Sequence, residues 1–402
     1  NKGGRNVVVT EGETDAMAAY QLQGSKYPAV SVQNAGAALK DCKRNYEWLD
    51  SFDTVTICFD NDEAGQAAAL EVADLFSGKS KIMRLGQYKD AVEILIDGAK
   101  GRSAWKDAFW GAEEYTPEGV IAGTEMWDIV NTPLAPPDAD YPWPGLQEMA
   151  YGIRFHELVV ITAGSGVGKS QISREIFDGL LRTTDHNIAG IYLEETYRKT
   201  GLGMMSIAAN KPLHLQESTE AEREAAFNAT LGCGRVYLSN SDAFGNATLD
   251  GVMSKVRYFR KAHDCRFIFI DHLGMITGGK GSNDERVMID EAITKLRTLA
   301  QEIGVCIFLI SHLKRPEGKG HEEGAQVSLS QLRGSGAIAH LSDIVIGAER
   351  NGQDECDYES NVVTLRLIKN RFSGEVGVCQ RLHYNKATGR MKEADPDGGE
   401  IL

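Results

Sequence analysis

Short apolar runs alternate with longer amphipathic stretches through the first quarter of the chain. The apolar runs predict strands at Asn6–Thr10, Ala29–Gln33, Thr54–Phe59 and Lys81–Leu85. Between them, stretches such as Thr14–Leu22 and Ala64–Phe76 have the apolar spacing of helices. Strands that alternate with helices are typical of a parallel sheet with helices on its faces, so this part of the chain is predicted to be an α/β domain.

The same alternation returns in the last two thirds of the chain. Strands are predicted at Glu157–Ala163, Ile188–Leu193, Arg235–Leu238, Arg266–Ile270, Val305–Ile310, Asp343–Ala348 and Val362–Ile368. The segment Thr116–Leu146 interrupts the pattern, because it holds more than half of the ten prolines. We therefore predict an α/β domain over residues 1–111, a linker over 112–144 with a short helix near Thr124–Val130, and a second α/β domain over 145–402.

Composition and charge narrow the class of protein. The chain has 402 residues, of which 42% are hydrophobic, and a net charge of -14. A nucleic acid would therefore have to bind through local basic clusters on an acidic body. No apolar run is long enough to span a bilayer, so we expect no membrane partner. The chain begins at Asn1, and we expect it to be a fragment of a longer protein.

A glycine-rich loop carries the strongest chemical signal. Gly164-Ser165-Gly166-Val167-Gly168-Lys169-Ser170 follows the apolar run Leu158–Thr162 and precedes a helical stretch, Gln171–Leu181. In this strand–loop–helix arrangement the loop N–H groups surround phosphate oxygens, Lys169 reaches the β- and γ-phosphates, and the Ser170 hydroxyl holds Mg²⁺. The strict pattern has a glycine where this chain has Ala163. The sequence predicts a nucleoside triphosphate site here.

Acidic residues follow two other predicted strands of the same domain. Asp271 ends the run Phe267–Ile270, at the sheet edge where the glycine loop lies, and is predicted to bind Mg²⁺. Glu194, with Glu195 beside it, follows Ile191–Leu193 and is a candidate base for the water that attacks the γ-phosphate. The residues leave a second interpretation open, in which both glutamates are solvated at a helix start.

Basic residues and a histidine follow two further strand ends. His312 is a candidate sensor of the γ-phosphate or a structural histidine. The glycine-rich loop that holds Lys314, Arg315 and Lys319 suits a nucleic-acid backbone, although an ordinary solvated loop has the same composition. Arg371 lies in a basic turn and would stabilise the charge on a neighbouring subunit's phosphate, a role that requires an oligomer.

Carboxylates also cluster after strands in the first domain. Glu11, Asp60, Asp62 and Asp90 each stand just past an apolar run or in the turn that follows it. Carboxylates at one edge of a parallel sheet repel each other, and divalent cations relieve that repulsion. Two Mg²⁺ held in this way would serve phosphodiester chemistry, whereas the alternative is a set of acidic loops without a metal.

Taken together, these motifs resemble a known family. Glu11-Gly12, Asp60-x-Asp62 and Lys89-Asp90 resemble the TOPRIM domain of primases and topoisomerases. The segment from Gly145 resembles the RecA-like P-loop NTPase domain of DnaB-family helicases, on the glycine loop, Asp271-His272, Ser311-His312 and Leu332-Arg333-Gly334-Ser335-Gly336. The order of domains resembles the bifunctional primase–helicases of short-tailed phages, to which mitochondrial Twinkle is related.

The resemblance implies roles for individual residues. It makes Glu194 the catalytic base, Asp271 the Mg²⁺ acid, and His312 the group that couples the nucleotide state to DNA. It also makes Arg371 a finger acting on the next subunit, and Arg350 and Tyr384 contacts of the nucleotide base. In the first domain it makes Glu11, Asp60, Asp62 and Asp90 the metal site of RNA primer synthesis.

The resemblance further implies a replicative DNA helicase. It would be a ring of six or seven copies that hydrolyses ATP or dTTP with Mg²⁺, moves on single-stranded and forked DNA, and works with a replicative DNA polymerase in the cytoplasm of an infected bacterium. The upstream zinc module and basic residues of phage primases are not in this sequence, so we expect primer synthesis to be incomplete. The alternatives are a TOPRIM nuclease coupled to an ATPase, and a helicase whose TOPRIM domain is a vestigial structural part.

Overall fold

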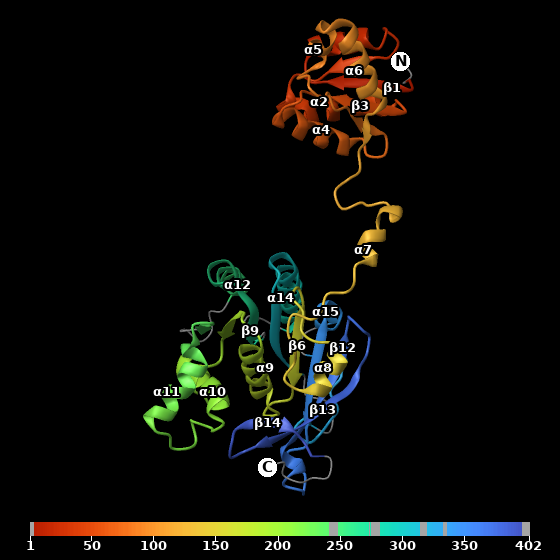
Figure 1. Cartoon of the computed structure of the whole chain (residues 1–402). Coiled ribbons are helices and arrows are strands. Elements are labelled where there is room, and N and C mark those ends of the chain that lie inside the picture. The colour runs from red at the N-terminus through yellow and green to blue at the C-terminus, as the bar shows by residue number, and fades with distance from the viewer. Residues whose placement is uncertain are drawn as a thin grey trace. The chain divides into compact units, whose positions relative to one another are not determined.

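The protein is described by a computed structural model that covers residues 4–240, 248–272, 274, 282–313, 320–332 and 336–395. The chain divides between Leu134 and Ala135 into two compact units, whose elements are labelled in Figure 1. Each unit is built around its own sheet, and the two are described in turn.

Unit 1 contains a five-stranded sheet in the order β2-β1-β3-β4-β5. The strands are β1 (Asn6–Thr10), β2 (Ala29–Ser31), β3 (Thr54–Cys58), β4 (Ser80–Ile82) and β5 (Glu113–Glu114). All pairs are parallel except β4 with β5, which is antiparallel. The four predicted strands of this unit are therefore confirmed, and β5 is an addition.

Helices cover both faces of this sheet. One face carries α1 (Glu13–Leu22), α5 (Ala91–Ile96) and α6 (Gly98–Trp110), and the other carries α2 (Ala38–Arg44), α3 (Tyr46–Asp50) and α4 (Glu63–Leu75). Alternation along β1 explains the two layers, because Val7 and Val9 pack with α4 while Val8 packs with α1 and α5. Both sides of the strand are apolar, as expected for a covered parallel sheet.

The proline-rich segment has two parts. A 3₁₀ turn at Gly123–Glu125 and helix α7 (Trp127–Asn131) lie in the region of the predicted short helix. Beyond Leu134 the chain joins unit 2, ahead of the predicted domain start at Gly145. Tyr141 and Trp143 are buried in the core of unit 2, where the indole N–H of Trp143 donates to the carbonyl of Met391 at 3.3 Å.

Unit 2 contains a nine-stranded sheet in the order β14-β13-β12-β11-β6-β10-β9-β7-β8. Its strands are β6 (Leu158–Ala163), β7 (Asn187–Tyr192), β8 (Val236–Asn240), β9 (Cys265–Asp271), β10 (Cys306–His312), β11 (Ile344–Arg350), β12 (Val362–Asn370), β13 (Gly377–Asn385) and β14 (Arg390–Glu393). The strands from β11 to β8 in this order are parallel, and β12, β13 and β14 join antiparallel.

The apolar pattern did not predict β13 and β14. These strands form one edge of the sheet and carry exposed or polar side chains such as Val378, Arg381 and Lys392, so they lack a continuous apolar run. The fold class predicted from the sequence is confirmed, because both units are layered α/β structures.

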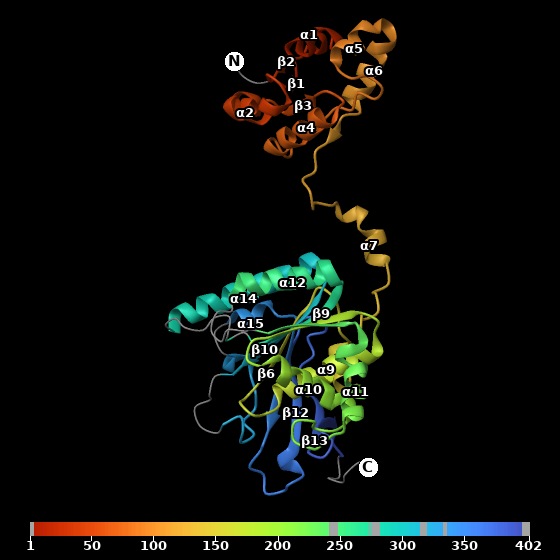
Figure 2. The ribbon, with the colours of Figure 1, turned by 90° about the vertical axis from the view of Figure 1, so that its left-hand side faces the viewer.

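Helices again cover both faces of the large sheet (Figure 2). One face carries α8 (Pro144–Ala150) and α9 (Lys169–Thr183), with α10 (Tyr197–Ala209) and α11 (Glu220–Ala229) beyond α9. The other face carries α12 (Leu249–His263), α14 (Ser282–Ile303) and α15 (Gly336–Leu341). In the described part of the chain, no helix combines the length and apolarity needed to cross a bilayer.

Candidate nucleotide and metal sites

The glycine loop connects the end of β6 to the start of α9. Gly166 and Gly168 have φ values of 74° and 116°, in the left-handed region that favours glycine. A Cβ atom on Gly168 would also lie 2.7 Å from the Cε of Met391, so the β13–β14 hairpin packs closely against the loop. The glycine at this position therefore serves both the turn and the packing.

Lys169 is buried beneath this loop. Its ammonium donates to the carbonyl oxygens of Ala163 and Gly164, at 2.9 Å each. Burial lowers the pKa of Lys169, and the carboxylates of Asp271 and Glu194 oppose that shift. The Lys169 side chain is thus a cation next to the glycine loop, and the carboxylates of Asp271 and Glu194 are near enough to stabilise its charge.

Asp271 ends β9 beside the glycine loop. Its Oδ2 lies 3.5 Å from the hydroxyl of Ser170, and only 7% of the residue is exposed. Burial is the main cause that raises the pKa of Asp271 to about 6, and the carboxylates of Glu195 and Glu194 add to it. A carboxylate and a hydroxyl at this spacing are suitable ligands for Mg²⁺, whose charge would relieve the same repulsion.

The two adjacent glutamates after β7 have different surroundings. Glu195 forms an ion pair with Arg174 at 2.7 Å and another with Lys199 at 3.2 Å, and its side chain is 10% exposed. Burial acts to raise the pKa of Glu195, but Arg174 and Lys199 outweigh it and lower the pKa. The Glu194 side chain is 47% exposed and contacts His272 instead. Glu194 is therefore the glutamate that can reach a bound substrate.

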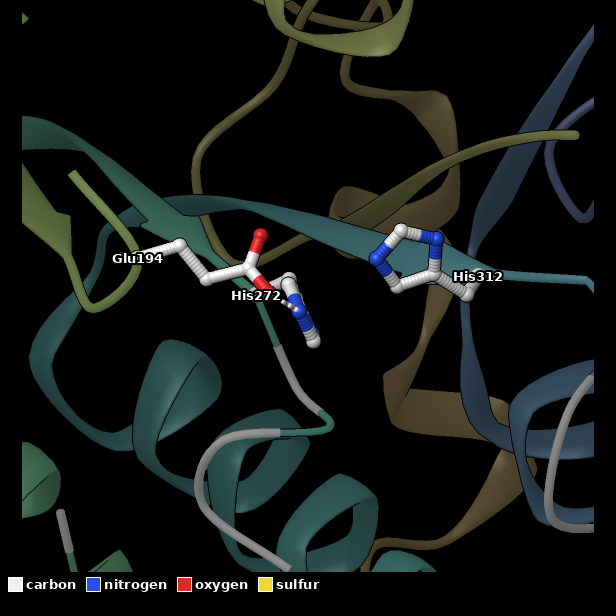
Figure 3. Close-up of side chains that lie close together, drawn as sticks. All are labelled: Glu194, His272 and His312. Atoms are coloured by element: carbon white, nitrogen blue, oxygen red, sulfur yellow. Dashed lines mark hydrogen bonds and ion pairs between the residues drawn. The ribbon is translucent and has the colours of Figure 1, made fainter. Parts of the chain in front are cut away.

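Glu194, His272 and His312 face one another at the sheet edge (Figure 3). The Nε2 of His272 contacts a carboxylate oxygen of Glu194, and the rings of His272 and His312 meet edge to face at 4.3 Å. In the described ranges this is the one group of three histidine, cysteine or carboxylate donors that lie within 4.8 Å of one another. Such a donor set can hold a divalent ion, although the same groups suit proton transfer and phosphate sensing.

Sheet register explains why these residues meet. The strands β6, β10, β9 and β7 are consecutive neighbours and all are parallel. His312 pairs with Ala163, and Asp271 pairs with Tyr192, so the strands end at the same edge. The glycine loop, His312, Asp271 and Glu194 each follow directly from one of these ends, where ligands bind in open α/β sheets.

The predicted acids of unit 1 also lie at the edges of its strands. Glu11 accepts a hydrogen bond from the backbone N–H of Ala35 at 3.2 Å, and its Oε2 is buried without a partner. Asp62 and Asp90 cap α4 and α5 through the N–H groups of residues 65 and 93, at 2.8 Å each. Asp60 lies 3.5 Å from the ammonium of Lys89.

Mutual repulsion marks these acids as one cluster. Burial is the largest cause that raises the pKa values of Glu11, Asp15 and Asp60, and neighbouring carboxylates add to it in each case. Asp15, on α1, was not predicted as a ligand, and the field of Asp90 and Asp60 places it in the same group. A Cβ on Gly65 would lie 3.0 Å from Glu11 Oε2, so the start of α4 approaches this acid closely.

Comparison with known proteins decides the family. A family model for the DnaB-like helicase C-terminal domain matches residues 142–393, and a Toprim-like model matches residues 8–95. The DNA helicase/primase of Enterobacteria phage T3 is 36% identical over 413 residues, which cover 99% of this chain and 71% of that protein. The chain belongs to the DnaB-like helicase family.

Other members share the motor part. The replicative DNA helicase DnaC of Bacillus subtilis is 25% identical over 261 residues, which cover 63% of this chain and 57% of that protein. A solved ATPase domain has a TM-score of 0.56 at 19% identity, with 69% of this chain and all of that chain covered. A DnaB-like replicative helicase, solved in a study of its interactions with primase, has a TM-score of 0.52 at 16% identity, covering 83% of this chain and 79% of that one.

These matches confirm the predicted combination of a Toprim domain and a DnaB-like motor. The protein is thus a DnaB-like helicase that carries a primase-type domain. Which of its residues act on which ligand is a separate question.

Two predicted base contacts lie beside the loop of this DnaB-like motor. Arg350 is at the end of β11, where its Nε donates to the carbonyl of Ser360 at 2.7 Å. Tyr384 is on β13 and pairs with Met391, the residue that packs on Gly168. Since β11 and β13 both run parallel to β6, their ends lie at the edge that carries the glycine loop.

Arg371 lies where the strands of the same sheet have their opposite ends, away from the strand ends that carry the glycine loop. It follows Asn370, which pairs with Ile344 at the start of β11, whereas Ala348 pairs with Ala163 at the loop. Four residue steps along β11 separate these levels by about 13 Å. The Arg371 of one chain is therefore remote from the glycine loop of that chain.

From the sequence, His321 was expected in the same basic segment as Lys314, Arg315 and Lys319 and was not predicted at the nucleotide site. It is 3% exposed, and a Cβ on Gly164 would lie 2.5 Å from the Cβ of His321, so this side chain packs on the glycine loop through its first carbon. Its Nε2 is buried without a hydrogen-bond partner. The predicted DNA contacts Lys314, Arg315 and Lys319 lie outside the described residues, as does Arg333.

The acidic cluster of the Toprim domain leads to a test by magnesium and pH. The raised pKa values of Glu11, Asp15 and Asp60 mean that the folded domain favours their protonated forms, so deprotonation removes stability as the pH rises through those pKa values. Mg²⁺ binds the deprotonated acids. We expect calorimetry to show Mg²⁺ binding at pH 7.5 and at least about threefold weaker binding at pH 5.

Hydrogen exchange would locate this magnesium. Peptides that cover β1 and β3 should exchange more slowly with Mg²⁺ in the wild-type protein and in Asp107→Asn, whose acid lies on α6, but not in Asp60→Asn. Equal protection in Asp60→Asn would contradict the site.

Proposed function

We propose that the motor unit hydrolyses a nucleoside triphosphate and uses the energy to move along single-stranded DNA and unwind forked duplexes. One observation carries this proposal, namely that four consecutive parallel strands bring a phosphate-binding loop, Asp271, Glu194 and His312 to one edge. These are the groups that hold, polarise and sense a phosphate in phosphoryl transfer. A DnaB-like family membership supports DNA as the track.

Each of these groups has a proposed task. The loop N–H groups of residues 164–168 and Lys169 bind the phosphates, while Ser170 and Asp271 hold Mg²⁺, which would neutralise phosphate charge. Glu194 orients the attacking water and takes its proton. His312 senses the γ-phosphate through its place at the end of β10.

The nucleotide is recognised at its base by Arg350 and Tyr384. ATP and dTTP carry the same triphosphate, which the loop would bind equally in both. The preference between their bases is therefore decided by these two side chains. Competition between the two nucleotides for hydrolysis would rank them.

The segment proposed to contact DNA is flanked by two residues that lie at the nucleotide site. His312 precedes residues 314–319, which hold Lys314, Arg315 and Lys319, and His321 follows them. The first histidine faces Glu194 and His272, and the second packs on Gly164. A change at the phosphates would therefore act on both ends of the segment proposed to contact DNA, which supports a coupling role for it.

His321→Ala tests this coupling. We expect DNA-free hydrolysis to stay within about threefold of wild type, and the stimulation by single-stranded DNA to fall about tenfold, because the imidazole beside Gly164 is removed. The measurement is phosphate release with and without a single strand. His263→Ala, which alters a histidine on α12, is the control, and undiminished stimulation in His321→Ala would refute the coupling role.

The position of Arg371 supports a ring. An arginine remote from the nucleotide loop of its own chain can serve the loop of a neighbouring chain, as the predicted finger requires. We propose a closed ring of six or seven copies. Electron microscopy with a non-hydrolysable nucleotide and single-stranded DNA should show a ring threaded by the strand.

For the Toprim unit we propose Mg²⁺-dependent primer synthesis. This activity would need further primase segments, such as a zinc module, and would act together with a replicative DNA polymerase. The acids grouped at its strand edges favour this activity over a purely structural role. No three of the described acids have donor atoms within 4.8 Å of one another, so any Mg²⁺ would have to draw them together or be held partly through water.

Two assays separate the alternatives for this unit. Nicking of plasmid DNA with Mg²⁺ would favour a nuclease. Primer synthesis by a protein that also contains a zinc module, and its loss in Asp60→Asn, would favour a primase over a structural domain.

The helicase proposal itself is tested by unwinding of a labelled fork with each nucleotide, and it fails if no nucleotide supports strand-stimulated turnover.

A further inference from the structure

A buried carboxylate lies next to the proposed arginine finger. Asp343 precedes β11 and is 4% exposed. Its Oδ2 accepts the backbone N–H of Leu158 at 2.8 Å, and its own N–H donates to the Leu158 carbonyl at 2.9 Å. These two bonds fix the carboxylate to β6, so its position is set by the centre of the sheet.

Two guanidinium groups share the other oxygen of this carboxylate. The Nη2 of Arg297 donates to Oδ1 at 2.9 Å, and the Nε of Arg371 lies 3.6 Å from the same atom. The Arg297 side chain is 13% exposed and the Arg371 side chain is 48% exposed. Arg297 therefore completes a buried ion pair, while Arg371 faces Asp343 with its Nε and keeps about half of its side chain exposed.

The backbone of the turn that holds Arg371 is fixed by Asp343 and by the residues on either side of Arg371. The N–H of Arg371 donates to the carbonyl of Asp343 at 2.8 Å. The side chain of Asn370 donates to the carbonyl of Met149 at 3.0 Å and accepts the N–H of Phe372 at 2.9 Å. The ring of Phe372 in turn lies under the guanidinium of Arg154, 3.9 Å from its centroid. The turn is thus held from three sides.

Helix α15 provides the remaining contact. The carbonyl of His340, in the last turn of α15, accepts hydrogen bonds from Arg371 and from Lys369, the latter at 2.8 Å. Burial and the nearby Arg371 lower the pKa of Lys369 to about 8. Three cations therefore lie near Asp343, and its charge offsets theirs together with that of the nearby Glu157.

We propose that Asp343 is a positioning residue that orients Arg371 toward the nucleotide of the neighbouring subunit. This inference rests on the proposed finger role of Arg371 and names the group that aims it. A finger acts only in the transition state, so its aim should matter for turnover and not for nucleotide binding. Removal of the charge would leave Arg371 with a single carbonyl partner beside two other cations.

Asp343→Asn is the test, because the amide keeps the shape and can still accept the N–H of Leu158. We expect DNA-stimulated kcat to fall at least about tenfold, with KM for the nucleotide within about threefold of wild type. Glu349→Gln is the matched control, since Glu349 is a partly buried acid near the far end of β11 that pairs with Arg366 at 2.7 Å. It should retain wild-type kcat. Melting curves and ring assembly of both variants exclude a general loss of structure.

A double-mutant cycle separates positioning from a structural effect. If Asp343 acts through Arg371, then Asp343→Asn has no further effect on kcat in an Arg371→Ala background, measured above the Lys169→Ala blank. An equal loss in both backgrounds, or wild-type kcat in Asp343→Asn, would overturn the inference. Wild-type kcat in Arg371→Ala would instead refute the finger role in the proposed function, and the inference with it.

Discussion

Lys169→Ala should abolish nucleotide hydrolysis and duplex unwinding, with turnover reduced about 10³-fold or more. The ammonium is buried at the mouth of the glycine loop and donates to the carbonyl oxygens of Ala163 and Gly164. It is the cation that would neutralise the β- and γ-phosphates, and alanine leaves the loop with backbone donors alone. Phosphate release and the separation of a labelled fork are the two measurements.

A second lysine on the same face of the motor provides the control. Lys199 pairs with Glu195 at 3.2 Å and its side chain is 71% exposed, so Lys199→Ala should hydrolyse and unwind nearly as wild type does. Unwinding by Lys169→Ala at the wild-type rate would end the assignment of this loop as the triphosphate site.

Glu194→Gln should lower hydrolysis by about 10²–10⁴-fold while nucleotide and DNA still bind. The amide keeps the size of the side chain and its contact with His272, but it cannot take a proton from water. The expected pattern is tight binding of a fluorescent nucleotide, normal binding of single-stranded DNA and little phosphate release. Such a variant would be a trap for the loaded state.

The adjacent glutamate is a stringent control for this result. Glu195→Gln removes the charge that pairs with Arg174 and Lys199, so we expect a lower melting temperature but a functional base. If Glu195→Gln lost turnover while Glu194→Gln retained it, the roles of the two residues would have to be exchanged.

The local parts of the motor site were predictable from the sequence because each follows directly from an apolar strand. Parallel strands end at one edge, so a loop after Ala163 and an acid at position 271 were expected at the same edge of the sheet. Glu194 was the candidate named from the sequence, but the pattern of residues alone gives no physical reason why it and not Glu195 faces the loop. That choice depends on Arg174, which lies on α9 and draws Glu195 to itself.

Contacts between distant segments were beyond the sequence pattern. His321 is on a polar, glycine-rich stretch, and nothing in that stretch indicates that it packs on Gly164. Asp343 was predicted only as the start of a strand. Its partners Arg297 and Arg371 come from a helix and a turn that are distant from it in the sequence, so their contacts could not be predicted. The edge strands β13 and β14 were missed because half-exposed strands carry a weak apolar signal.

The Toprim acids were predictable as a group but not as a ligand set. Asp15 lies on a helix, not after a strand, and it joins the cluster because α1 packs against α5 and brings it near Asp90. The rule that functional residues follow the ends of parallel strands does not predict which helices pack together. The additional acid was therefore found only from the electrostatics of the folded domain.

Arg371 and the glycine loop stand at opposite edges of one sheet, and this has a consequence for how the enzyme is switched on. With the proposed finger role, a solitary molecule holds two half-sites that never meet, so it consumes no nucleotide while it diffuses alone. Specific activity should then collapse on dilution and recover on concentration, which would tie consumption of nucleotide to assembly around a strand.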